Sequence, residues 1–138
     1  MIILALRYFA LSAAYLGRFI QCLTRYESSH TNVIVGDLNL SKINWSTLSC
    51  PTDNLHRPFL TFLVESSFSQ LVSFPTHADH ILDLILTSDD SIFSHVEPDL
   101  PLAASDHTSI KFTITLSEAH VHTPVSYTHL TLPTKRIV

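Results

Sequence analysis

Apolar residues recur along the chain in blocks whose spacing changes from helical to extended. The block after Ser12 repeats apolar residues at intervals that bring them to one face of a helix, with Ser12 as a candidate N-cap. A second helix is expected where Pro58 can occupy a first turn. The apolar residues assigned to the two helices are Leu16, Phe19, Ile20 and Leu23 in the first, and Phe59, Leu60, Phe62 and Leu63 in the second.

Runs of β-branched and apolar residues between and after these helices predict strands. The run at 32–36 is continuously apolar after its first residue, which is typical of a strand buried on both faces, so we expect it at the centre of a sheet. Further strands are expected at 70–73, 81–87, 92–96 and 109–116. In the last of these, Ile110 and Phe112 alternate with polar residues, as in a strand with one buried face. The pattern as a whole predicts an α/β fold.

Composition narrows the class of protein. A chain of 138 residues with 46% hydrophobic and 14% charged residues is expected to form one folded domain. Its net charge of −4 provides no basic surface to hold a polyanion, so chemistry on phosphates or nucleic acids would need a cation. Cys22 and Cys50 suggest neither a disulfide framework nor a cysteine zinc site, which favours a reducing, intracellular compartment.

Both ends of the chain are expected to lie outside the domain. The apolar start is interrupted by Arg7 and Arg18, well short of the ~20 residues that a membrane span needs, so we predict no transmembrane helix. The segment 124–136 has two prolines and no acidic residue, and it resembles a tail translated by accident from sequencing-adapter nucleotides. We therefore expect the domain to cover 12–116 and a disordered, artefactual tail to cover 117–138.

Polar residues directly follow the expected central strand. Asp37 and Asn39 are two positions apart, so their side chains can point to the same side, beyond the carboxyl end of a strand where α/β sheets bind ligands. A carboxylate can hold a hard cation or take a proton from water, and an amide can donate to a phosphate oxygen. The alternative is a simple Gly–Asp turn that closes the strand.

Two further acidic residues are not explained by the strand pattern. Asp83 lies within the apolar run 81–87, where an ionised carboxylate is costly unless it is paired, so we expect a basic or imidazole group beside it. An exposed position at the start of the strand is the alternative. Asp106 and His107 can supply a carboxylate and an imidazole at one point, with Asp83 fixing the tautomer of that imidazole, although a polar turn also explains them.

Other histidines show zinc-like spacing. His77 and His80 are separated by two residues, and His120 and His122 by one. Since the nine histidines are scattered over loops with no cysteine nearby, we interpret these pairs as surface histidines.

Taken in order, the motifs resemble a known superfamily. They are Gly36-Asp37-Leu38-Asn39 after a strand, Asn44-Trp45, the segments 70–76 and 82–87, and Ser105-Asp106-His107 before a last strand. This order is similar to the second half of the endonuclease/exonuclease/phosphatase domain, above all that of the apurinic-type endonucleases of non-LTR (LINE-like) retrotransposons. The resemblance implies an incomplete α/β fold, the C-terminal half of a four-layered, DNase I-like α/β sandwich.

The resemblance also implies an activity, namely cleavage of DNA phosphodiester bonds with a divalent cation, usually Mg²⁺. It makes Asp37 a residue that activates or positions water and binds metal, and Asn39 one that steadies the water and the scissile phosphate. Asp106 would contribute to the metal site, and His107 would contact the phosphate or transfer a proton, oriented by Asp83. A metal would neutralise charge on the phosphate, which a chain of net charge −4 cannot do alone.

The chain also departs from the family pattern. The family's first half carries a metal-binding glutamate, and the glutamates of this chain do not stand in that context. His77 stands where many relatives have arginine, which weakens phosphate contact. Because Asp37 and Asp106 make a thin cage for Mg²⁺, we expect negligible nuclease activity.

The missing first half also affects association and function. We expect an exposed apolar sheet face that drives self-association. Two alternatives to an endonuclease remain, a phosphatase of the same superfamily that acts on a small phosphate ester and a non-catalytic, degenerate remnant that at most binds a partner.

Overall fold

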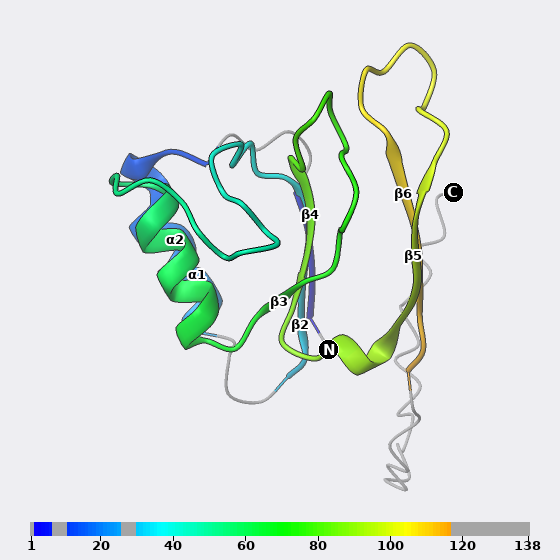
Figure 1. The fold of residues 1–138 in the computed structure, drawn as a ribbon. Helices are drawn as coiled ribbons and strands as arrows, with labels where there is room; N and C mark the ends of the chain where they lie inside the picture. Colours follow the sequence, from blue (N-terminus) through cyan, green and yellow to red (C-terminus); the bar gives the residue numbers. More distant parts are fainter. Residues whose placement is uncertain (1, 7–10, 26–29, 117–138) are drawn as a thin grey trace, which may run out of the picture.

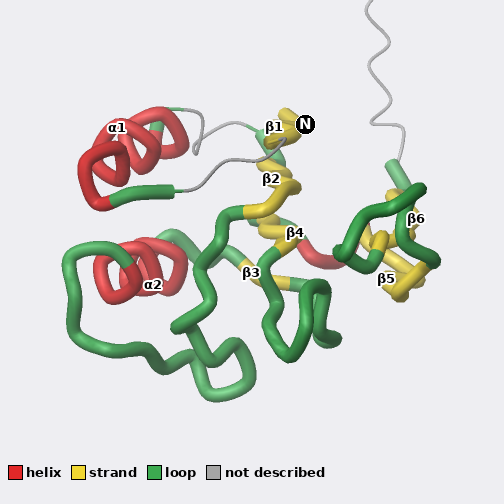
Figure 2. The backbone as a smooth tube through the Cα atoms, turned by 90° about the horizontal axis from the view of Figure 1, so that it is seen from above, coloured by secondary structure: helices red, strands yellow, loops and turns green. Residues whose placement is uncertain are grey.

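The computed structural model describes residues 2–6, 11–25 and 30–116, which form an α/β fold in layers (Figure 1). In chain order the elements are β1 (Ile2–Leu6), α1 (Ala13–Thr24), β2 (Asn32–Asp37), α2 (His56–Glu65), β3 (Ser69–Gln70), β4 (Asp83–Thr87), the 3₁₀ helix η1 (Asp90–Ile92), β5 (Phe93–Asp99) and β6 (Ser109–Ile114). The helices cover one face of the larger sheet, and β5 and β6 lie on its other side (Figures 1 and 2).

The larger sheet has the strand order β1-β2-β4-β3. β2 is parallel to β1 and antiparallel to β4, which confirms that the strand after residue 31 is central. β4 is also antiparallel to β3. The β2–β4 register pairs Asp37 with Asp83, so two acidic side chains from distant parts of the sequence stand side by side where β2 ends and β4 begins.

The main core lies between the helices and this sheet. Both helices bury the apolar faces that their spacing predicts, and the Phe19 and Phe59 rings meet between them with centroids 6.2 Å apart. From the sheet, Ile34, Leu84 and Leu86 pack into the same cluster. α1 begins directly after Ser12, and α2 begins two residues before Pro58, which lies in its first turn. Both predicted helices are therefore confirmed.

The described side chains on the opposite face of β2 and β4 are also buried or partly buried, which corrects the expectation of an exposed apolar face. Alternation along the paired strands puts Val33, Val35 and Ile85 on this face, and Val33 and Ile85 are each only 1% exposed. The antiparallel β5–β6 pair forms a second sheet on this side (Figure 2). An open pocket of about 460 Å³ remains between the two sheets, lined among others by Val35, Ile85, Ile110 and Phe112. The expectation was wrong because the last two strands do not extend the main sheet but form a second layer.

Several strand boundaries differ from the sequence prediction. The strand expected at 70–73 is only Ser69–Gln70, and the one expected at 81–87 begins at Asp83. β5 continues to Asp99, and β6 ends at Ile114. β1 was not predicted, and its pairing with β2 places residues before position 12 in the sheet.

The helices of the described residues are too short or too polar to cross a bilayer. The segment 117–138 lies outside the described residues, so its assignment as a disordered, artefactual tail stays a prediction.

Candidate active site

Asp37 closes β2 and begins a tight turn. Gly36 precedes it with φ at 152°, a value that residues with a β-carbon rarely adopt. The Asn39 amide donates to Asp37 Oδ1 at 3.0 Å, and Asn39 has φ at 52°, in the left-handed region that asparagine tolerates. The Asn39 side chain is therefore presented on the surface beside the partly buried Asp37 carboxylate. The turn and the candidate site use the same residues, so one interpretation does not exclude the other.

Asp83 has the imidazole partner that its place in an apolar strand predicts. Its Oδ2 lies 2.7 Å from His107 Nδ1, and the two side chains are 24% and 28% exposed. This hydrogen bond raises the pKa of His107 above its usual value, against the opposing effect of burial. The charges of Asp83, Asp37 and Asp106 raise the pKa further. His107 is thus anchored through one ring nitrogen and favoured in its charged form.

Thr76 positions this pair, a role that the sequence analysis missed. Its Oγ1 accepts hydrogen bonds from the backbone amides of Leu82 and Asp83, each at 3.0 Å. Its carbonyl accepts from the Thr108 amide at 2.7 Å, and the residue is only 1% exposed. Thr76 therefore ties the start of β4 to the segment directly after His107. The one signal in the sequence was its place at the end of the 70–76 motif.

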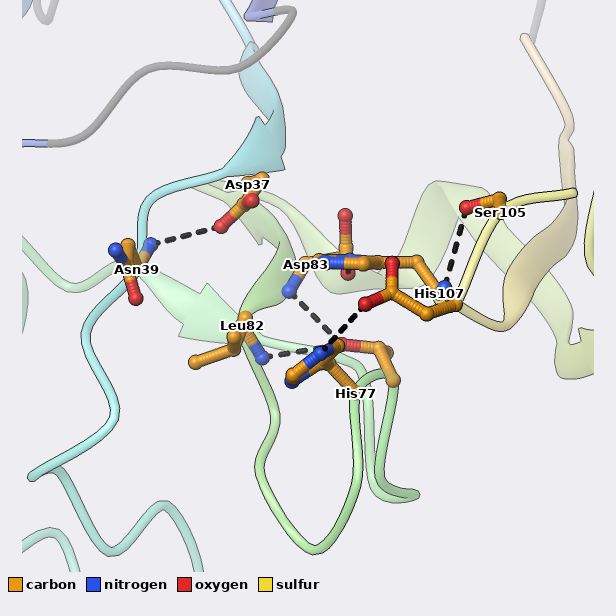
Figure 3. Close-up of polar contacts among 9 residues, drawn as sticks. Asp37, Asn39, His77, Leu82, Asp83, Ser105 and His107 are labelled. Carbon is orange, nitrogen blue, oxygen red and sulfur yellow. Dashed lines mark hydrogen bonds and ion pairs between the residues drawn. The ribbon is translucent and has the colours of Figure 1, made fainter.

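His77, interpreted from the sequence as a surface histidine at a place where many relatives have arginine, is 36% exposed and also lies at the site. Its Nε2 is 3.0 Å from Asp106 Oδ2, and its ring centroid is 4.7 Å from that of His107. The hydrogen bond from His77 is the largest cause of a lowered pKa of Asp106. Figure 3 shows His77 and His107 close together beside Asp83, with Asp37 and Asn39 at the end of the neighbouring strand. Spacing along the chain cannot reveal this contact, because His77 and Asp106 are 29 residues apart.

Two groups of three side chains can offer ligands to a metal ion. One is Asp37, Asp83 and His107, and the other is His77, Asp106 and His107, with the ligand atoms of each group within 4.8 Å of one another. The two residues predicted to bind metal, Asp37 and Asp106, fall in different groups that share His107. The first group includes two carboxylates, the ligand type that Mg²⁺ takes beside its own waters. No glutamate among the described residues belongs to either group.

The pocket between the two sheets reaches this site. Asp83, Ser105 and His107 line it on the polar side, and Leu102 and Phe112 line it on the apolar side. The His107 amide donates to Ser105 Oγ at 3.1 Å within the loop before β6 (Figure 3). A ligand held at His107 therefore has space for an attached apolar group.

The chain is similar both to a known protein family and to solved structures. A sequence profile described as endonuclease-reverse transcriptase matches residues 8–111. The structure is similar to that of the "Endonuclease domain of TRAS1, a telomere-specific non-LTR retrotransposon", with a TM-score of 0.60 and 18% identity. The match covers 80% of this chain and 55% of that one, so the chain spans about half of the domain it resembles. This likeness confirms the expected partial DNase I-like fold, and no curated protein matched the sequence.

Proposed function

Since the chain belongs to the endonuclease–reverse transcriptase family, we propose that its site has the chemistry to contact DNA and to hydrolyse phosphodiester bonds with Mg²⁺ as cofactor, although this chain alone should hydrolyse them only negligibly. The observation that carries the proposal is the meeting of Asp37, Asp83 and His107 at the adjoining ends of β2 and β4. Such a cluster combines a fixed imidazole with carboxylates that can hold a cation or a water molecule. DNA as substrate also agrees with the intracellular location that the cysteine content predicts.

His107 is the group we expect to touch the phosphate. Asp83 occupies Nδ1, so Nε2 is the nitrogen that can donate to a phosphate oxygen or to a leaving oxygen. The raised pKa of His107 favours the charged imidazolium, which suits both roles. Asp83 acts through His107 and is a positioning residue.

Asp37 and Asn39 are proposed to hold the water and the phosphate on the other side. The Asp37 carboxylate is the ligand for Mg²⁺ or the acceptor of a proton from water, and the exposed Asn39 amide can donate to the phosphate. When bound, Mg²⁺ supplies neutralising charge for the phosphate. We keep Asp106 as a second proposed metal ligand, although its carboxylate contacts His77 in the structure.

We expect the hydrolytic activity of this chain to be negligible. Asp83 is committed to His107, and Asp106 contacts His77, which leaves Asp37 as the main carboxylate for a cation. Mg²⁺ demands near-octahedral oxygen coordination and is held poorly by one carboxylate. In a plasmid assay with Mg²⁺, we expect no nicking above background. Robust nicking that Asp37→Ala abolishes would contradict the negligible activity and support the assignment of Asp37.

DNA contact can be tested without turnover. A short DNA duplex with Mg²⁺, titrated into ¹⁵N-labelled protein, should shift the NMR signals of Asn39 and His107 most strongly, and His107→Gln should weaken binding. His95→Asn on β5 is the matched control and should leave binding unchanged, because asparagine tolerates the positive φ of this exposed residue. Shifts confined to other faces, or none at all, would overturn the proposal.

A phosphatase acting on a small phosphate ester is the second candidate, favoured by the pocket beside His107. The volume of about 460 Å³ and the apolar side chains of Leu102 and Phe112 suit a small ester with an apolar group. Comparing p-nitrophenyl phosphate with bis(p-nitrophenyl) phosphate separates the two functions. Hydrolysis of the monoester alone would favour the phosphatase, and hydrolysis of neither, with no DNA contact, would favour the non-catalytic remnant.

Self-association remains a proposal, with a different surface as its cause. The segment that joins β5 to β6 exposes Leu100 and Leu102 by 81% and 76%, and Leu116 just after β6 is 59% exposed. We propose that these side chains associate between copies of the chain. Size-exclusion chromatography should show species larger than a monomer at high concentration, and a monodisperse monomer would contradict this.

A further inference from the structure

We propose that His77, Asp106 and His107 form a zinc site beside the position assigned to Mg²⁺ at Asp37. The three residues come from two loops, the turn before β4 and the loop before β6, and their ligand atoms lie within 4.8 Å of one another. The zinc site rests on ligand geometry and not on the proposed hydrolysis, but it shares Asp106 and His107 with the site proposed for Mg²⁺ and phosphate, so bound zinc would compete with those two roles. His77 is the residue that makes it possible.

The side chains already stand close to the spacing that zinc requires. Zn²⁺ forms bonds of about 2.0–2.1 Å to nitrogen and oxygen, which puts two ligand atoms of a tetrahedral site roughly 3.3 Å apart. His77 Nε2 and Asp106 Oδ2 are 3.0 Å apart, and the ligand atoms of all three residues lie within 4.8 Å of one another. Exposures of 36% for His77 and 79% for Asp106 leave these side chains room for the small adjustment that closes the site.

Asp83 prepares His107 to act as a ligand. Its carboxylate accepts from Nδ1 at 2.7 Å, and in the neutral ring this leaves the lone pair on Nε2. Histidines that bind zinc almost always donate their other ring N–H to a carboxylate or carbonyl, which fixes the tautomer and raises the basicity of the ligand. The Asp83–His107 pair has this arrangement.

The ligand set selects zinc over magnesium. Two imidazoles and one carboxylate suit a borderline-soft ion, whereas Mg²⁺ prefers oxygen ligands. Three protein ligands leave a fourth position of a tetrahedral site open to water. The carboxylates of Asp37 and Asp83 lie nearby and add attraction for a divalent cation.

The proposed zinc site differs from the pairing of His77 with His80 that their spacing in the sequence suggests. His77 and His80 are joined by a backbone bridge across a turn, and His80 belongs to neither group of metal-capable side chains among the described residues. The exposed His80 is therefore a matched control for His77, from the same turn and of the same residue type.

The test is a zinc chloride titration of the full chain, by competition with a chromophoric chelator and without DNA. We expect one zinc ion per chain at this site, not displaced by excess Mg²⁺. His77→Ala should weaken the zinc affinity about tenfold or more, and His80→Ala should leave the zinc affinity unchanged. Asp83→Asn should weaken it roughly 10–100-fold. Co²⁺ in place of Zn²⁺ should give the visible absorption of a tetrahedral site in the wild type and lose it in His77→Ala.

Equal zinc affinity of the wild type and His77→Ala would overturn the proposal, and so would equal losses in His77→Ala and His80→Ala. The second result would show binding by scattered surface histidines. Since both side chains are on the surface turn, circular dichroism should show both variants folded. Zinc binding and DNA contact are measured separately, so failure of one is distinguishable from failure of the other.

Discussion

Thr76→Val removes the hydroxyl that holds the start of β4. Thr76 Oγ1 accepts from the amides of Leu82 and Asp83 at 3.0 Å each, and the first of these contacts is buried while the second is partly buried. An amide left without an acceptor in a buried place costs about 1–3 kcal/mol. Because water can reach the second amide in part, the two losses together should lower the free energy of unfolding by about 2–4 kcal/mol.

Urea unfolding followed by circular dichroism measures this loss, with Thr76→Ser as the matched control. Serine keeps the acceptor and removes one buried methyl group, so it should cost only about 1 kcal/mol. In Thr76→Val the NMR signal of the His107 ring should also move, because Asp83 loses its anchor. Equal destabilisation by the two variants would refute the reasoning, since the loss would then come from the methyl group and not from the hydroxyl.

Three further substitutions test the Asp83–His107 pair, the start of α2 and the core. Asp83→Asn should lower the pKa of His107. In the wild type that pKa is raised in the folded state, so the Asp83–His107 pair stabilises the protein fully below the usual pKa of 6.5. This stabilisation is lost as pH rises through the raised pKa. The urea stabilities of variant and wild type should differ by about 1–2 kcal/mol near pH 6 and converge at high pH; a constant difference would contradict this. Asp53→Ala removes a carboxylate that accepts hydrogen bonds from two backbone amides at the start of α2, which helps to lower the pKa of Asp53 to about 2. The loss of stability caused by this substitution should be full above the usual pKa of 3.8 and should shrink as pH falls through about 2. An effect that does not depend on pH would contradict that assignment. Phe59→Ala should cost about 3–5 kcal/mol in urea unfolding because the ring is fully buried. Val64→Ala, at an exposed position, should cost under about 0.5 kcal/mol, and similar losses in the two variants would contradict a core centred on Phe59.

The pattern of apolar residues over short stretches of sequence predicted the two helices and the central strand. The apolar spacing of α1 and α2 identified the buried side chains, because a helix face repeats within a few residues. The run before Asp37 predicted a central strand, because both of its faces are buried. The imidazole beside Asp83 was also predictable, since a carboxylate in an apolar strand requires a partner.

Features that depend on distant partners could not be predicted in this way. β1 is a strand only because it pairs with β2, and its short apolar sequence does not show a partner 30 residues away. His77 carries no local sign of its contact with Asp106. The same limit applies to β6, whose alternation shows one apolar face but not which surface lies against it.

The most direct test of the account is the response of the His107 imidazole to DNA. In a ¹H–¹⁵N NMR experiment on the ring nitrogens, a short duplex with Mg²⁺ should shift the Nε2 signal while Nδ1 stays bound to Asp83. In Asp83→Asn the shift of the Nε2 signal should be smaller. This shift should saturate together with that of Asn39. A His107 ring that does not respond while DNA binds elsewhere would contradict the assignment of this site to phosphate chemistry.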